Sequence, residues 1–240
     1  MRIVRAKALG FCFGVRRAID MVAEAAEERG PIDSLGSIVH NPVVVDGLAA
    51  KGVQVVGGLE DVESRTVAVT AHGRGPEIEE ETKERGLDLV DTTCPIVRKS
   101  QKAAQGLCAD GFGVIIYGEE DHPEVMGVLA WTEGKGRAIL DPEAEIDIPH
   151  RKLSLLAQTT KSEQSFAEFV GRFVGRNSGR IKELRIVNTT CKETVGVTAG
   201  ASRPDESIDE VVARLEKLAE MLHAKEQRTR RLPLSNLMDA

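Results

Sequence analysis

The sequence predicts an α/β protein built from parallel βα units, and two observations support this fold class. Short runs of β-branched and aliphatic residues alternate along the chain with amphipathic segments of helical periodicity. Several of the helical segments open with proline, which fits the first turn of a helix because its missing N–H is not needed there. Alternation of this kind is typical of parallel sheets covered by helices.

The first half of the chain contains five predicted strands and three predicted helices. A short strand at Ile3-Val4 leads to a helix that carries Ala18, Val22 and Ala25 on one face and ends at Gly30. Strands are then predicted over residues 35–39, 53–56, 66–69 and 87–90, and helices over residues 42–50 and 77–85.

A second round of alternation follows. It consists of a helix from Pro95, a strand at 113–117, a helix from Pro123, a strand at 138–140, a loop at 141–150, a strand at 153–157, a helix at 162–174 and a strand at 184–187. A last helix after Pro204 repeats apolar residues from Ile208 to Leu222 at the spacing of a core-facing stripe.

One sequence pattern occurs twice. Residues 89–94 resemble residues 186–191, and each segment reads as a buried strand that delivers Thr-Thr-Cys at its carboxyl end. The simplest explanation is a repeated α/β lobe.

Composition and charge exclude several classes of function. A net charge of −6 and an aromatic content of 3% argue against a nucleic-acid-binding protein, which usually presents a basic surface or stacking rings. No apolar run approaches the roughly 20 residues that span a bilayer, and the N-terminus does not read as a signal peptide. We therefore expect a cytoplasmic protein without membrane or nucleic-acid partners, whose four cysteines are not disulfides.

Reactive side chains gather where the predicted strands end. In parallel sheets, ligands bind at the carboxyl ends of the strands, so these side chains should share one edge. They are Cys12, His40, His72, Cys94, His122, Glu124, Thr159, Thr160 and Cys191. Cys108 differs, because it lies in helical register with Ala104 and reads as a core residue.

Three thiolates from distant loops, Cys12, Cys94 and Cys191, could bind zinc or an iron–sulfur cluster. Structural zinc sites favour paired Cys-x₂-Cys motifs, which are absent, whereas a catalytic zinc held by three cysteines stays possible. A 4Fe-4S cluster with three cysteine ligands leaves one iron open as a Lewis acid. Histidines beside such a group suit an anionic ligand, as do helix N-termini.

Eight motifs in order resemble those of the LytB (IspH) family of 4-hydroxy-3-methylbut-2-enyl diphosphate reductases. They are Leu9-Gly10-Phe11-Cys12-Phe13-Gly14-Val15, Val39-His40-Asn41-Pro42, Ala71-His72-Gly73, Thr92-Thr93-Cys94-Pro95, His122-Pro123-Glu124-Val125, Gln158-Thr159-Thr160, Asn188-Thr189-Thr190-Cys191 and the run from Gly196 to Ser202. The resemblance extends from Met1 to about Leu222.

The resemblance implies three pseudo-symmetric open α/β lobes around one central 4Fe-4S cluster, with boundaries here at 1–94, 95–183 and 184–240. It implies that Cys12, Cys94 and Cys191 hold the cluster, that His40, His72, His122 and Ser202 contact the substrate's diphosphate, and that Glu124 donates a proton through Thr159. The implied reaction removes the C4 hydroxyl of an allylic diphosphate to give isopentenyl and dimethylallyl diphosphates. A ferredoxin or flavodoxin-type protein would supply the electrons.

One segment departs from the family pattern. The family carries a strand, two helices and a Ser-x-Asn type motif between its third cysteine and the run ending at Ser202, whereas here Thr194 leads directly into Val195. Parallel neighbouring strands need a crossover of a dozen or more residues, which this junction cannot supply. Either the strands form a hairpin, one is not a strand, or a segment has been lost, and we favour loss and expect an incomplete third lobe with impaired turnover.

Two other functions stay open at this stage. One is a non-catalytic iron–sulfur-binding remnant of the family, and the other is a zinc-dependent α/β hydrolase.

Overall fold

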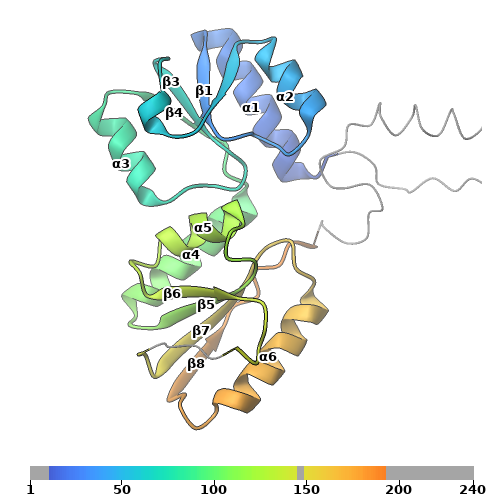
Figure 1. Cartoon of the computed structure of the whole chain (residues 1–240), viewed down its shortest axis with the longest axis vertical. Helices are drawn as coiled ribbons and strands as arrows, with labels where there is room; N and C mark the ends of the chain where they lie inside the picture. Colours follow the sequence, from blue (N-terminus) through green and yellow to red (C-terminus); the bar gives the residue numbers. More distant parts are fainter. Residues whose placement is uncertain (1–10, 145–148, 193–240) are drawn as a thin grey trace, which may run out of the picture.

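The computed structural model describes residues 11–144 and 149–192. Within them the chain forms two four-stranded parallel sheets, each with helices on both faces (Figure 1). The α/β class predicted from the sequence is therefore confirmed. The strand expected at Ile3-Val4, the helix expected after Pro204, Ser202 and the junction after Thr194 lie outside the described residues.

The first sheet has the order β2-β1-β3-β4. Its strands are β1 (Ile32–Leu35), β2 (Val53–Val56), β3 (Thr66–Val69) and β4 (Asp88–Asp91), and its helices are α1 (Phe13–Arg29), α2 (Pro42–Ala49) and α3 (Pro76–Glu84), with a 3-10 turn at Leu59–Asp61. Side chains alternate between the faces of a strand. Ala68 accordingly packs with Val22 of α1, whereas Val67 and Val69 pack on the opposite face with Ile78 of α3.

The second sheet has the order β6-β5-β7-β8. Its strands are β5 (Gly113–Tyr117), β6 (Gly136–Ile139), β7 (Lys152–Ala157) and β8 (Glu183–Ile186), and its helices are α4 (Pro95–Ala109), α5 (Pro123–Ala130) and α6 (Glu163–Asn177). Leu107 of α4 and Val128 of α5 pack on one face, and Phe166, Phe169 and Phe173 of α6 fill the other.

Prolines mark helix starts as the sequence predicted. Helices α2, α3, α4 and α5 begin at Pro42, Pro76, Pro95 and Pro123. Helix α1 ends with Gly30 at a φ of 85°, a left-handed conformation that glycine adopts without strain.

The strand expected over 35–39 is wrong in position. Strand β1 is Ile32–Leu35, and the chain leaves the sheet at Gly36, whose φ is 91°. Two polar residues inside the strand concealed it, because both are buried with partners. The Asp33 carboxylate accepts hydrogen bonds from the backbone of Glu63 and Ser64, and the Ser34 hydroxyl donates to the Gly36 carbonyl.

Strand β8 also differs from expectation. We expected a buried strand opening the third lobe at residue 184, but β8 pairs with β7 and completes the second sheet. It is the edge strand there, and Ile186 is 51% exposed. The division of the chain at 94 and 183 into three lobes remains a prediction, since 193–240 lie outside the described residues.

No helix in the described part of the chain is long and apolar enough to span a bilayer.

Candidate active site

Four helices begin at residues that the sequence singled out. Cys12 is the N-cap residue of α1, Cys94 of α4 and His122 of α5, and His40 directly precedes Asn41, the N-cap residue of α2. Unpaired amide groups and the helix dipole make each N-terminus favourable for negative charge.

The three histidines predicted to contact a substrate lie together. The ring centroids of His40 and His72 are 4.9 Å apart, and those of His72 and His122 are 5.6 Å apart. His40 is exposed, whereas the other two are partly buried. Imidazoles from the segment before α2, from the loop after β3 and from the N-cap position of α5 thus form one cluster, although the three residues are widely separated in the sequence.

Burial disfavours the charged forms of His72 and His122 in the free protein. Burial is the main cause that lowers the pKa of His72 to about 4, and His40, His122 and Arg74 lower it further as neighbouring positive charges. Burial likewise lowers the pKa of His122. The His122 Nδ1 atom accepts a hydrogen bond from the backbone N–H of Glu124 at 3.2 Å, so the neutral ring carries its proton on Nε2.

The three cysteines predicted to be cluster ligands are each partly exposed and free of disulfides. Burial raises the pKa of the Cys94 thiol, the amides of Ile96 and Val97 lower it, and the nearby thiols of Cys12 and Cys191 raise it. The thiols of Cys12 and Cys191 are therefore near enough to Cys94 to influence its ionisation. Cys108 is buried and donates to the Thr132 carbonyl, which confirms the core role predicted for it.

A glycine permits the approach of α1 to Cys94. A Cβ atom at Gly14 would lie 2.5 Å from Cys94 Sγ. The first turn of α1 therefore packs directly on the sulfur, and no other residue fits at this position without displacement.

The repeated Thr-Thr-Cys pattern forms the same turn twice. Thr92 donates to the carbonyl of Val69 on the neighbouring strand, and Thr189 donates to that of Ala157. Cys94 N–H then bonds to the Ala71 carbonyl at 3.0 Å, and Cys191 N–H bonds to the Thr159 carbonyl at 2.7 Å. The side chains of Asp91 and Asn188 close the two turns by accepting from Thr93 and Thr190, respectively. The two sheets thus present these cysteines in equivalent ways.

Glu124 is a buried carboxyl group, 3% exposed. Its Oε1 accepts the Thr159 backbone N–H at 2.6 Å, and its Oε2 lies 2.7 Å from the Thr159 hydroxyl. Burial raises the pKa of Glu124, and the two bonds from Thr159 oppose that shift in part. Thr159 therefore connects this acid with the Cys191 turn, because its carbonyl accepts from Cys191.

Sequence reasoning missed the residues that hold these loops in place. Gln101 is fully buried and, with Trp131, contacts the loop that carries His72. Thr92 and Thr189 were read only as part of a repeat. For Gln101, the only signal in the sequence was a glutamine on an otherwise apolar helix face.

No group of three or more His, Cys, Asp or Glu side chains in the described ranges is arranged to share a single metal ion. Cysteines that bind an iron–sulfur cluster attach to different irons and need not converge as the ligands of one ion do. Three thiols free of disulfides, two of them at helix N-termini and one of these packed against Gly14, fit such a cluster.

Comparison with known proteins decides the family. The model of the LytB protein family matches residues 3–194. The chain belongs to the LytB family.

Curated relatives in the LytB family carry one enzyme name. The 4-hydroxy-3-methylbut-2-enyl diphosphate reductase of Dehalococcoides mccartyi is 42% identical over 195 residues, which cover 80% of this chain and 69% of that protein. The 4-hydroxy-3-methylbut-2-enyl diphosphate reductase of Geobacter sulfurreducens is 34% identical over 248 residues, and the alignment covers all of this chain and 86% of that protein.

Solved structures of LytB-type reductases have the same fold. The reductase of Plasmodium falciparum matches with a TM-score of 0.70 and 27% identity, over 78% of this chain and 60% of that one. A second structure, of the terminal enzyme of the non-mevalonate pathway, matches with a TM-score of 0.65 and 34% identity, over 80% of this chain and 68% of that one.

Proposed function

We propose that this chain is a 4-hydroxy-3-methylbut-2-enyl diphosphate reductase. Two electrons and two protons would remove the C4 hydroxyl as water and leave isopentenyl or dimethylallyl diphosphate. The observation that carries the proposal is one site that combines three thiols, three clustered imidazoles and a buried carboxyl group hydrogen-bonded to Thr159.

Cys12, Cys94 and Cys191 would hold one 4Fe-4S cluster. The close packing of Gly14 on Cys94 and the matched turns at Cys94 and Cys191 support this assignment. When bound, the cluster would supply the electrons and a Lewis-acidic iron. A ferredoxin or flavodoxin-type protein is the electron donor that we expect.

His40, His72 and His122 would bind the diphosphate, with Ser202 as a further contact. The neutral His122 ring offers its Nε2–H because its Nδ1 is occupied by the Glu124 amide. The N-termini of α2 and α5 add to the attraction for an anion.

Glu124 would deliver a proton through Thr159. Burial raises the pKa of Glu124 and so favours its protonated form, and the Thr159 hydroxyl can accept that proton from Oε2 while passing its own proton onward. The Thr159 backbone N–H holds Oε1 and so leaves Oε2 as the oxygen that exchanges the proton.

The shortened junction favours a second candidate, a cluster-binding remnant without turnover. The match of the LytB family model ends at residue 194, where we infer from the sequence pattern that a segment has been lost, although the alignment with the Geobacter sulfurreducens reductase continues over the whole chain. Diphosphate contacts on that stretch would then be missing, and substrate binding would be weak.

Anaerobic reconstitution followed by an assay with a chemically reduced donor separates the two candidates. The reductase should contain about four irons and four sulfides per chain and convert the allylic diphosphate to both products. A full cluster without product identifies the remnant, and insertion of a complete third-lobe segment between Thr194 and Val195 should then restore turnover. Zinc in place of iron would overturn both candidates and favour the hydrolase.

A further inference from the structure

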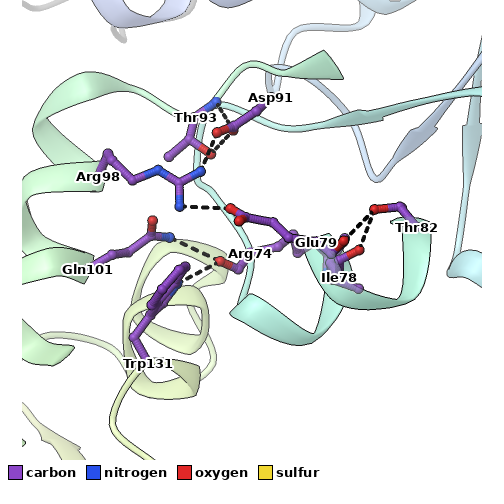
Figure 2. A network of polar contacts seen from close by, with 9 residues as sticks. All are labelled: Arg74, Ile78, Glu79, Thr82, Asp91, Thr93, Arg98, Gln101 and Trp131. Carbon is purple, nitrogen blue, oxygen red and sulfur yellow. Dashed lines mark hydrogen bonds and ion pairs between the residues drawn. The ribbon is translucent and has the colours of Figure 1, made fainter. Parts of the chain in front are cut away.

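The backbone carbonyl of Arg74, two residues after His72, accepts two hydrogen bonds from side chains of the other sheet's helices. Gln101 Nε2 of α4 donates at 3.2 Å, and Trp131 Nε1 at the end of α5 donates at 3.0 Å (Figure 2). Both donors follow site residues on their helices, because α4 begins after Cys94 and α5 after His122.

The loop that contains His72 lies against these same two helices. A Cβ atom at Gly73 would lie 2.4 Å from Gln101 Nε2, and a Cβ at Gly127 of α5 would lie 3.0 Å from the Gly73 carbonyl oxygen. Gly73 has a φ of 74°, which a side chain would rarely adopt. The backbone beside His72 is therefore in direct contact with both helices.

The Gln101 amide is held in one orientation at a cost. Reversing it would bring its oxygen against the Arg74 carbonyl, so Nε2 must face Arg74. Its Oε1 is then buried without a hydrogen-bond partner in the part of the chain that the structure describes. A buried unsatisfied oxygen is unfavourable, and in this orientation the bond from Nε2 to the Arg74 carbonyl is the one that the Gln101 amide retains.

Trp131 is held in turn by Arg98. The Arg98 guanidinium lies 5.7 Å from the Trp131 ring centroid, and it pairs with Asp91 on β4 and with Glu79 on α3 at 3.2 Å (Figure 2). Asp91 also accepts from Thr93, the residue before Cys94. The network thus joins the His72 loop to the turn that presents Cys94.

We propose that Gln101 and Trp131 are positioning residues that fix the His72 imidazole for a diphosphate by holding the Arg74 carbonyl. This inference rests on the proposed function, in which His72 binds the substrate's diphosphate. Loss of either donor loosens the Arg74 carbonyl, while Gly73 N–H stays bonded to Thr70 and Cys94 N–H to Ala71, so the imidazole is less well ordered before the anion binds. Affinity for the diphosphate should fall, while the proton delivery at Glu124 is left in place.

The test uses the full reconstituted chain with Gln101→Met and Trp131→Phe. Methionine keeps the volume without a donor, and phenylalanine keeps a ring beneath Arg98 without the N–H. Binding of inorganic diphosphate, measured by calorimetry, should weaken about 5-fold in each variant, the scale of one lost hydrogen bond. KM for the allylic diphosphate should rise similarly, with kcat nearly unchanged.

Gln105→Met is the matched control, because Gln105 is exposed one turn further along α4. It should bind diphosphate as the wild type does. Unchanged diphosphate affinity in both test variants, or a fall in kcat without a change in KM, would overturn the inference while the reductase assignment stands. If His72→Ala itself binds diphosphate normally, the anion-binding role of His72 fails, and the positioning inference fails with it.

Discussion

Thr159 contacts both oxygens of the Glu124 carboxyl group, with its backbone N–H 2.6 Å from Oε1 and its hydroxyl 2.7 Å from Oε2. The two contacts have different consequences. The amide can only donate and fixes the carboxyl plane, whereas the hydroxyl can donate or accept and is able to pass a proton. Thr159 is therefore suited to pass a proton between the buried acid and a bound substrate.

Removing only the hydroxyl tests that connection. Thr159→Val keeps the amide bond and the branched shape, so substrate should bind with a nearly unchanged KM. We expect kcat to fall by about 100-fold, within the range that positioned proton transfer supplies. Thr159→Ser should recover most of the rate in single-turnover measurements, and an equal loss in both variants would rule out a proton relay.

The pH dependence of stability should change when Glu124 cannot ionise. Burial raises the pKa of Glu124 in the folded chain, so folding favours its neutral form and its contribution to stability is lost as the pH rises through that raised pKa. Glu124→Gln has no charge to bury. In urea unfolding, the free energy of the Gln variant relative to the wild type should therefore increase as the pH rises from about 4.5. A difference that stays constant with pH would contradict a raised pKa.

Diphosphate binding should be linked to protonation of His72. With a pKa of about 4, His72 is neutral in the free protein near pH 7, whereas a bound anion favours the charged imidazolium and raises its pKa. Affinity should therefore tighten as the pH falls from 7 towards 5, with proton uptake that calorimetry in two buffers detects. His72→Asn corrects for protonation of the diphosphate itself, and an identical pH slope in that variant would contradict the linkage.

Two glycine substitutions should differ in their effect on iron binding. Gly14→Ala places a Cβ 2.5 Å from Cys94 Sγ and should reduce the iron content per chain by half or more. Gly106→Ala on α4 meets nothing within 4 Å, and it should keep the iron content while adding about 0.5–1 kcal/mol of stability. Equal iron content in the two variants would show that the approach of α1 to Cys94 does not matter for the site.

The sequence predicted the local features of this fold well because prolines and alternating apolar runs report on nearby residues. Four helix starts fell at prolines, and strands β2, β3 and β5 lie where the apolar runs placed them. Strand β1 was misplaced because the hydrogen bonds that satisfy Asp33 and Ser34 come from a loop about thirty positions away and from the turn after the strand.

The chemistry of the site was predictable residue by residue, whereas its support was not. The cysteines, the histidines and Glu124 can be recognised from their residue type and from their place after predicted strands. The bonds to the Arg74 carbonyl join residues 27 and 57 positions apart and use a backbone acceptor, which no side-chain pattern reveals. Such contacts depend on how two sheets pack, a property of tertiary structure alone.

The helix starts at Cys12, Asn41, Cys94 and His122 have a consequence for the speed of substrate capture. The chain as a whole carries a net charge of −6 and repels a diphosphate at long range, while the helix ends attract it within a few ångströms. Dissolved salt screens the distant repulsion over about 8–10 Å but hardly reaches the partly buried helix ends. Moderate ionic strength should therefore raise the association rate of the diphosphate. At a positively charged binding site, the same salt would lower that rate.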